Sequence, residues 1–135
     1  MADTFRFDLV SPERVLVTED VSEVIVPSNE GDFGMLPNHA PIIASLRPGA
    51  LTVRGSGGEK KYFVRGGLAE GGPEQLTVLA QRAMPLDELD REKIAQEIEW
   101  AKEDVDDAGE EDARAQAVDN LERLETLAEV LRQNA

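Results

Sequence analysis

Apolar and polar residues alternate near the start of the chain with a period of two. Phe5, Phe7 and Leu9 are separated by the charged residues Arg6 and Asp8. A strand that buries one face and exposes the other has this period, because successive side chains point to opposite sides. The chain is therefore predicted to open with an amphipathic strand.

Further short apolar segments follow, and glycine and proline separate them. Pro27 is expected to end one segment because it cannot donate to a strand ladder. Pro48-Gly49 suits a tight turn, and Gly55 to Gly58 is a hairpin signal. The apolar segments are Val15 and Val17, Val24 to Val26, Ile42 to Ala44, Leu51 to Val53, Tyr62 to Val64, and Leu76 to Leu79.

The pattern changes after Pro85. Beyond this residue the sequence has no proline and only one glycine, Gly109. Two stripes at helical spacing follow, and Asp106 to Gly109 separates them with a connection short enough for antiparallel helices. Because both stripes are narrow and rich in alanine, the helices can approach closely but bury little area. The stripes are Ile94, Ile98, Ala101 and Val105, then Ala113, Ala117, Leu121, Leu124, Ala128 and Leu131.

The expected fold class is thus β followed by α. Residues 1–85 are predicted to form a β-sandwich, a flattened barrel of about ten strands, because short strands recur with turn signals between them. Residues 86–135 are predicted to form a two-helix antiparallel hairpin that is marginal by itself.

Charge is concentrated in the helical part. The chain has a formal net charge of −14, of which residues 1–85 contribute −3 and residues 86–135 contribute −11. Such a surface disfavours nucleic acid and anionic lipid as partners. The absence of cysteine excludes disulfides and thiolate chemistry, and no apolar run is long enough to insert directly into a membrane.

Residues Glu30 to Pro41 are expected to form an elaborate turn that holds His39, the only histidine. One histidine without clustered carboxylates predicts no metal site, and a hydrogen-bonded turn histidine is favoured over a charge switch. Glu30 and Asp32 are interpreted as exposed contact charges, not an acid–base pair. No catalytic residue is predicted.

Two other features have plain structural interpretations. Gly66-Gly67 lies between strand patterns and lacks the strand–loop–helix context of a phosphate-binding loop, so backbone turns or bulges are expected there. Trp100, the only tryptophan, is expected to dock against its own domain in preference to serving as an interface anchor.

Several motifs together resemble one family across the whole chain, and the stretch from Glu30 to Pro41 is the most specific because unusual residues stand at fixed spacing. The motifs are SPE at Ser11 to Glu13, VPSNEGDFGMLPNHAPI at Val26 to Ile42, LRPG at Leu46 to Gly49, FVRGG at Phe63 to Gly67, and LTVLA at Leu76 to Ala80. They resemble the epsilon subunits of F-type ATP synthases, called delta in mitochondria.

The resemblance implies a non-catalytic central-stalk protein without a cofactor. Its sandwich would grip the gamma subunit, stand on the membrane ring of c-subunits and turn with that ring during proton transport. Glu30, Gly31, Asp32 and His39 match the part of the family that contacts the polar loops of the ring. Rigid turns and complementary surfaces suit such a coupling role.

The resemblance also raises a nucleotide site, and here the chain departs from the family pattern. ATP-binding members carry [IL]DxxRA at the start of the first helix; only Leu89 and Asp90 match, while Lys93 and Ile94 replace arginine and alanine. Met84 stands where the family has an acidic residue. Because lysine lacks the planar fork of arginine, this vestigial site is expected to bind ATP more weakly than millimolar or not at all.

Inhibitory members insert the second helix between the catalytic alpha and beta subunits, where basic side chains meet an acidic loop. From Glu110 to Ala135 this chain has a net charge of −4, so repulsion is expected to oppose that contact. The hairpin is therefore predicted to stay folded down and to inhibit ATP hydrolysis poorly.

Two other classes compete with this interpretation. A stand-alone sandwich adaptor or ligand-binding module would hold an apolar pocket between its sheets, but it leaves the Val26 to Ile42 motif unexplained. An acidic histone- or cation-binding chaperone would explain only the acidic half. Because the segment Met1 to Val10 lacks the basic and apolar features of a leader, the expected location is the cytoplasmic face of a bacterial inner membrane.

Overall fold

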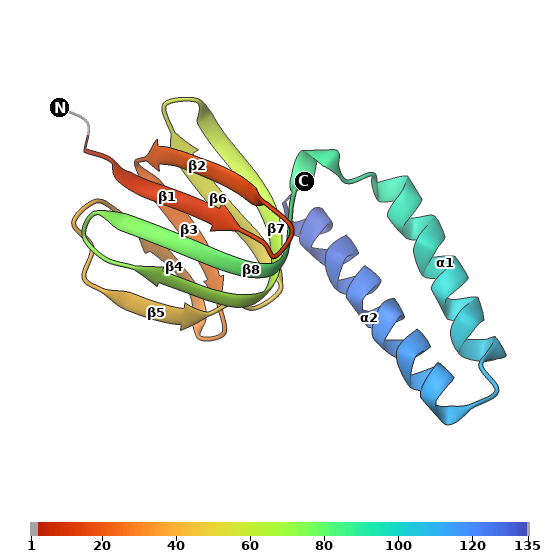
Figure 1. The fold of residues 1–135 in the computed structure, drawn as a ribbon. Coiled ribbons are helices and arrows are strands. Elements are labelled where there is room, and N and C mark those ends of the chain that lie inside the picture. The colour runs from red at the N-terminus through yellow and green to blue at the C-terminus, as the bar shows by residue number, and fades with distance from the viewer. Residues whose placement is uncertain (1–2, 135) are drawn as a thin grey trace. The chain divides into compact units, whose positions relative to one another are not determined.

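The computed structural model describes residues 3–134, which form two compact units. One unit extends to Leu86 and contains all the strands, and the other begins at Asp87 and contains both long helices (Figure 1). That each unit folds as a separate domain, with the boundary after Pro85, stays a prediction.

The first unit is built from eight strands in one mixed sheet (Figure 1). They are β1 Phe5–Val10, β2 Val15–Val21, β3 Glu23–Ser28, β4 Gly31–Met35, β5 Ile42–Ser45, β6 Gly49–Gly55, β7 Gly58–Gly71 and β8 Gln75–Pro85. The pairing order is β2-β1-β8-β7-β6-β3-β4, with β5 added to β7. The sheet is not closed and has eight strands among the described residues, so the expectation of a barrel with about ten was too high.

The sheet folds over to make the predicted sandwich because β7 serves both layers. Its first half pairs with β6, while Leu68–Gly71 pairs with β5. Between these halves Gly66 and Gly67 have φ angles of 70° and 99°. A Cβ on Gly67 would lie 1.9 Å from the Leu79 carbonyl oxygen, so only glycine fits. This confirms that the glycine pair is a backbone feature of the sheet.

Side chains from both layers meet in a continuous core. Phe7, Leu9 and Met35 are fully buried, and the alternation predicted for the first strand is confirmed. The core comprises Phe5, Phe7, Leu9, Val17, Val21, Val24, Val26, Met35, Leu46, Leu51, Val53, Tyr62, Val64, Ala69, Leu76, Val78 and Ala80. Aliphatic and aromatic side chains therefore pack where the adaptor alternative would place its apolar pocket.

Two local expectations were wrong. Pro27 does not end β3, which continues through it to Ser28. Its carbonyl oxygen accepts a hydrogen bond from the Arg47 N–H at 3.1 Å, so the proline still contributes an acceptor although it has no donor. The stretch from Glu30 to Pro41 is not one long turn, because Gly31–Met35 forms strand β4.

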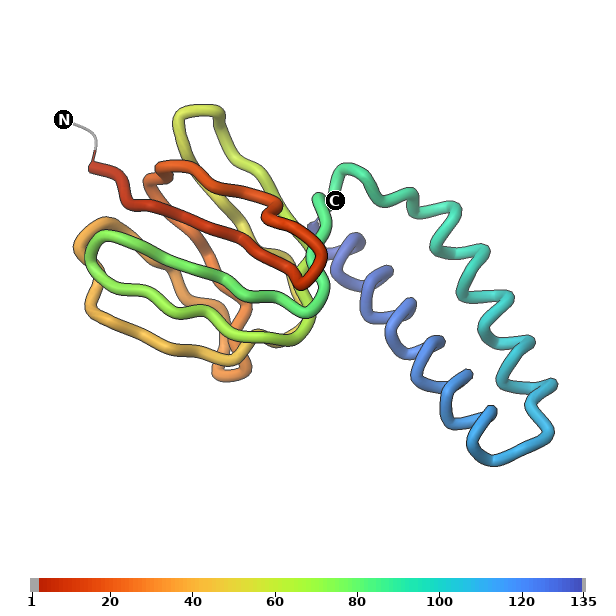
Figure 2. Tube along the Cα trace, viewed as in Figure 1, coloured from red at the N-terminus to blue at the C-terminus, as the bar shows by residue number. Residues whose placement is uncertain are grey.

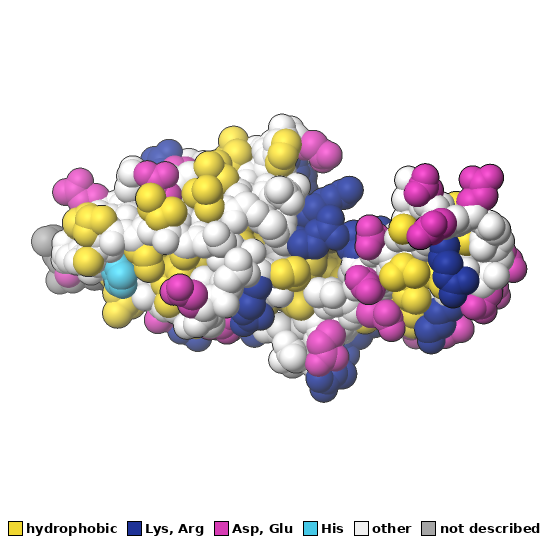
Figure 3. Space-filling model, turned by 90° about the horizontal axis from the view of Figure 1, so that it is seen from below, with side chains coloured by type: hydrophobic (Ala, Val, Ile, Leu, Met, Phe, Trp, Pro, Cys, Tyr) yellow, Lys and Arg dark blue, Asp and Glu magenta, His cyan; other side chains and the backbone are white. Residues whose placement is uncertain are grey.

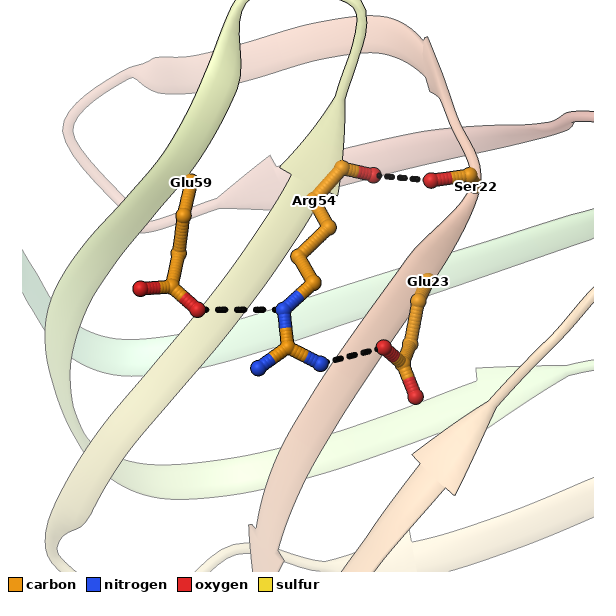
Figure 4. Close-up of polar contacts among 4 residues, drawn as sticks. All are labelled: Ser22, Glu23, Arg54 and Glu59. Carbon is orange, nitrogen blue, oxygen red and sulfur yellow. Dashed lines mark hydrogen bonds and ion pairs between the residues drawn. The ribbon is translucent and has the colours of Figure 1, made fainter.

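Charged side chains join strands β3, β6 and β7 on the surface of the sandwich. Arg54 on β6 lies between Glu23 on β3 and Glu59 on β7, and its Nε is 3.0 Å from Glu59 Oε1 (Figure 4). A hydrogen bond to Glu23, and a second to Glu59, raise the pKa of Arg54 above its ordinary value. The Arg54 carbonyl also accepts the Ser22 hydroxyl at 3.0 Å, which connects β6 to the segment between β2 and β3. These contacts are structural.

A short 3-10 helix, Leu86–Glu88, spans the boundary between the units, and the second unit contains two helices, α1 Arg91–Asp107 and α2 Glu111–Gln133. Figure 2 shows that the chain reverses direction between the two helices, as predicted. Asp106 and Asp107 belong to α1, so the connection begins later than expected, at Ala108. The predicted antiparallel hairpin is confirmed.

The contact between the helices is small. The buried residues of the two helices are Ile94, Ala101, Leu124, Leu127, Val130 and Leu131. Leu127 and Val130 were absent from the predicted stripe, whereas Ala113 was included and is exposed. Trp100 is 57% exposed, so the expected docking against its own domain was wrong.

Candidate functional site

The hairpin between β3 and β4 presents Glu30 and Gly31 to solvent on a rigid turn. The Ser28 hydroxyl is buried; it donates to the Gly31 carbonyl at 2.6 Å and accepts from the Glu30 N–H at 3.2 Å. Gly31 has a φ of 116°, which a residue with a side chain rarely adopts. The turn is therefore ordered by its own hydrogen bonds.

The two acidic residues of this hairpin have different surroundings. Asp32 forms an ion pair with Arg47, whose backbone is in turn hydrogen-bonded to Pro27. Glu30 forms no ion pair with any described residue. Glu30 therefore remains a free negative charge at the tip, while the charge of Asp32 is largely compensated.

His39 lies away from these residues. It belongs to the loop after β4, and the five residues of β4 separate that loop from the hairpin by about 13 Å at the usual rise per residue. The Asn38 N–H donates to the Pro73 carbonyl at 2.9 Å, so the loop is attached to the turn between β7 and β8. The structure thus brings Glu30, Gly31 and Asp32 together but not His39.

The His39 ring has a local partner. Its Nδ1 is 2.8 Å from the carbonyl oxygen of Ala40, and the side chain is half-buried. This is the hydrogen-bonded turn histidine that the sequence favoured. Around it, the space-filling view shows hydrophobic side chains gathered on this face of the sandwich (Figure 3).

A row of aliphatic side chains, three exposed and one half-buried, crosses strands β2, β1, β8 and β7, and sequence reasoning missed it. Val15, Val10, Leu79 and Leu68 are consecutive cross-strand partners on β2, β1, β8 and β7. Val15 is 60% exposed, Leu79 46% and Leu68 37%. We call these four residues the aliphatic row.

A shallow groove of about 270 Å³ adjoins this row. Its lining is formed by Val10, Ser11, Pro12, Leu79, Ala80 and Gln81. The signal for the row was present in the sequence, because Val10 and Leu79 are apolar at positions that the alternation of buried residues assigns to the outside. Apolar groups at such positions indicate a surface that a partner covers.

The positions matched to the nucleotide motif have structural duties in the hairpin. Asp90 is the N-cap of α1 and accepts the N–H groups of Glu92 at 2.9 Å and Lys93 at 3.2 Å. Ile94 is buried against α2, and Lys93 is exposed. Leu89 is half-buried. The carboxylate is therefore occupied by the helix cap.

Arg91, which the sequence analysis did not single out, joins the two helices. Its Nη2 donates to the Leu131 carbonyl at 2.9 Å, near the end of α2. A cavity of about 100 Å³ lies beside it, between Arg91, Ile94, Ala128, Leu131 and Arg132. Sites for ligands of drug size usually measure about 300–1,000 Å³, so this space is small for a nucleotide.

No group of three or more side chains that could hold a metal ion lies together in residues 3–134. Over the same residues, no helix combines the length and the apolar character needed to cross a bilayer. What the described surface offers is contact: a charged hairpin tip and an aliphatic row.

Comparisons with known proteins agree with this picture. Residues 4–86 match the model for the beta-sandwich domain of the ATP synthase delta/epsilon chain. The ATP synthase epsilon chain of Maricaulis maris is 46% identical over 96% of this chain and 98% of its own length. The ATP synthase epsilon chain of Mesorhizobium japonicum is 44% identical over 94% of this chain and 95% of its own length.

Solved structures give the same match. A chain in the cryo-EM structure of the Euglena gracilis mitochondrial ATP synthase, OSCP/F1/c-ring, is 29% identical with a TM-score of 0.76, covering 95% of this chain and 81% of the other. A chain of the Tetrahymena thermophila mitochondrial ATP synthase, central stalk and c-ring, has a TM-score of 0.57 at 15% identity, which shows likeness of fold alone. It covers 98% of this chain and 96% of the other.

Proposed function

Because the chain belongs to the ATP synthase delta/epsilon family, as a non-catalytic subunit of the enzyme, we propose that it couples rotation of the c-ring to the gamma subunit in the central stalk. The observation that carries this proposal is the aliphatic row on a sandwich with a filled core. A part that transmits torque needs a stiff body and an adhesive surface, and these features supply both.

The aliphatic row is the proposed contact with gamma. Val15, Leu79 and Leu68 come from three different strands, so a partner that covers them is held by the sheet as a unit. Burying exposed aliphatic side chains is favourable at roughly 25 cal/mol per Å² of apolar area. Contact across several strands also resists sliding of one body over the other.

The hairpin tip is the proposed contact with the polar loops of the c-ring. Glu30 offers an unpaired charge, while Gly31 and the Asp32–Arg47 ion pair hold the turn that presents it. His39 is included in this contact surface, but it lies at the opposite end of β4. It would therefore meet a different loop of the ring from the one that Glu30 meets.

The start of α1 is proposed to bind ATP more weakly than millimolar, or not at all. Asp90 caps the helix, Lys93 has no guanidinium fork, and Ile94 fills the space where the family uses alanine. Calorimetric titration of the full chain with ATP should give no resolvable heat at micromolar protein. A fitted dissociation constant in the micromolar range would contradict this.

The hairpin is proposed to inhibit ATP hydrolysis poorly if its acidic second helix approaches the catalytic alpha and beta subunits. The net charge of −4 from Glu110 onward opposes contact with an acidic loop. Removal of residues 86–135 should leave the ATPase rate of the assembled enzyme nearly unchanged. A several-fold rise after removal would make the hairpin an inhibitor.

The proposed location is the cytoplasmic face of a bacterial inner membrane, where the chain would be peripheral. The similarity to epsilon chains of bacteria supports this placement. Contact with the membrane would then be indirect, through the c-ring.

Co-purification with the gamma subunit tests the coupling role most directly. Wild-type chain should form a stable one-to-one complex with gamma, and Leu79→Asp should weaken it by at least tenfold because it places a charge in the centre of the aliphatic row. Ser56→Asp, in the exposed turn between β6 and β7, is the matched control and should bind as wild type does. Failure of the wild-type chain to bind gamma would restore the adaptor alternative.

A further inference from the structure

The sandwich has an open edge between β4 and β5. Strand β4 pairs only with β3, and β5 pairs only with β7, so the facing edges of β4 and β5 are not joined by a ladder. Residues of both strands line one cavity, so β4 and β5 lie near each other. At one end the Asn29 N–H bonds to the Ser45 carbonyl at 2.9 Å, which ties the β3–β4 hairpin to β5.

A cavity of about 350 Å³ occupies this edge. Its lining comes from the hairpin and from the whole of β5, namely Ser28, Asn29, Glu30, Phe33, Ile42, Ile43, Ala44 and Ser45. The lining is apolar along β5 and Phe33, and polar at the hairpin end. We call this cavity the edge groove.

The backbone of Ile43 points into the edge groove. In an antiparallel ladder both main-chain groups of a residue point to the same side, and the side alternates along the strand. The Ser45 carbonyl points away from β7, because it accepts from Asn29. Ile43, two residues earlier, therefore directs its N–H and C=O the same way, where no described strand pairs with them.

The charge of the groove is also uncompensated. Glu30 lines it without an ion pair among the described residues, and no lysine or arginine is part of the lining. Ile43 has a side chain that is 73% exposed, so the open edge carries an apolar group beside its free backbone groups. An unprotected strand edge of this kind is a template for pairing with another chain.

We propose that the edge groove accepts an extended segment of a neighbouring ATP synthase subunit, which adds to β5 as a strand and places a lysine or arginine beside Glu30. Main-chain hydrogen bonds to Ile43 provide the pairing, and the basic side chain sets the direction of the segment. This inference rests on the proposed function, because it requires assembly with the other subunits.

Hydrogen exchange tests the pairing without any variant. Exchange at the Ile43 amide should slow by at least tenfold when the full chain is assembled into ATP synthase, relative to the isolated full chain, with amide-level resolution by fragmentation. The Ala44 amide already pairs with β7 and should change much less. An unchanged Ile43 amide in the assembled enzyme would overturn the proposal.

Two variants at one position separate backbone pairing from side-chain contact. Ile43→Pro removes the N–H that faces the groove but leaves the β5–β7 ladder intact, since proline is tolerated where an edge N–H is unpaired. Ile43→Ala keeps that N–H and removes most of the side chain. Loss of one hydrogen bond should weaken assembly of the proline variant about fivefold beyond the alanine variant.

Equal affinity of the two folded variants would overturn the proposal, and thermal melting of each variant checks that both are folded. If the proline variant does not fold, hydrogen exchange on the wild-type chain decides. Failure of the wild-type chain to bind gamma counts against the proposed function, whereas normal assembly with an unprotected Ile43 amide counts against strand addition alone.

Discussion

The two units of this chain bury their apolar residues in different ways. In the sandwich, side chains from strands far apart in sequence meet in one core, and several of them are fully inaccessible to solvent. In the hairpin, six residues from two neighbouring helices are buried, and one of them is alanine. The comparison shows that stiffness is a property of the sandwich, while the hairpin is held by a thin contact.

The hairpin contact is also uneven along its length. Most of its buried residues belong to the first turn of α1 and the last turns of α2, where Arg91 also bonds to Leu131. Toward the connection between the helices, Ala113 is exposed and Ala117 is only half-buried. The end of the hairpin near Ala108 should therefore open first, because fewer contacts oppose its opening.

The largest effect is expected from Phe7→Ala in the sandwich. Phe7 is fully buried at the centre of the core, and truncation of such a residue costs about 3–5 kcal/mol. Urea denaturation followed by β-sheet circular dichroism should show the loss. A variant as stable as the wild type would mean that the sandwich is not the rigid unit.

Leu127→Ala should next weaken the hairpin alone. Leu127 is a buried residue of α2, and its truncation costs about 2–3 kcal/mol, which is large for a pair of helices with so few buried residues. Helical ellipticity should fall at 25 °C while β-sheet signals persist. Joint unfolding of both units would contradict their separate stability and the domain boundary predicted after Pro85.

Gly67→Ala should cost about 2 kcal/mol or more in the sandwich. The residue has positive φ, and its Cβ would overlap the Leu79 carbonyl. Gly58→Ala is the matched control, because Gly58 also has positive φ but nothing lies within 4 Å of its Cβ position. Thermal unfolding should lower the melting temperature of the first variant clearly more than that of the second.

Asp90→Ala should destabilise the hairpin by about 1 kcal/mol, the usual contribution of an N-cap. Asp90 accepts two backbone N–H groups at the start of α1. Asp104→Ala, on an exposed position within the same helix, is the control. Equal helical melting temperatures for the two variants would show that Asp90 does not stabilise the helix as an N-cap.

Acid should have the smallest effect, through Glu129. A hydrogen bond from Arg132 lowers the pKa of Glu129 below its ordinary value of 4.5. A lowered pKa contributes stability that is present above about pH 4.5 and is lost as the pH falls through the lowered value. Glu129→Gln should remove the part of the acid-induced loss of hairpin stability that comes from Glu129. If the melting temperature of this variant depends on pH as that of the wild type does, the Glu129–Arg132 pair contributes nothing.

Local patterns predicted many elements correctly. The first strand, the hairpin at Gly55 to Gly58 and the two antiparallel helices all follow from periodicity and turn residues, which act over a few positions. The motif from Glu30 to Pro41 resembles the ATP synthase delta/epsilon family, and the comparisons show that the chain belongs to this family. The aliphatic row was missed because its members lie on four separate strands.

Tertiary structure alone decided which of these residues meet. The sequence placed Glu30 and His39 in one motif, but pairing of β3 with β4 turns the intervening residues into a strand and sends the two to opposite ends of it. Sequence likewise could not reveal the open edge at β5, since an edge exists only when the order of all strands is known. Residue spacing thus determined the local elements, while strand order determined the surfaces, because cross-strand neighbours are set by long-range pairing.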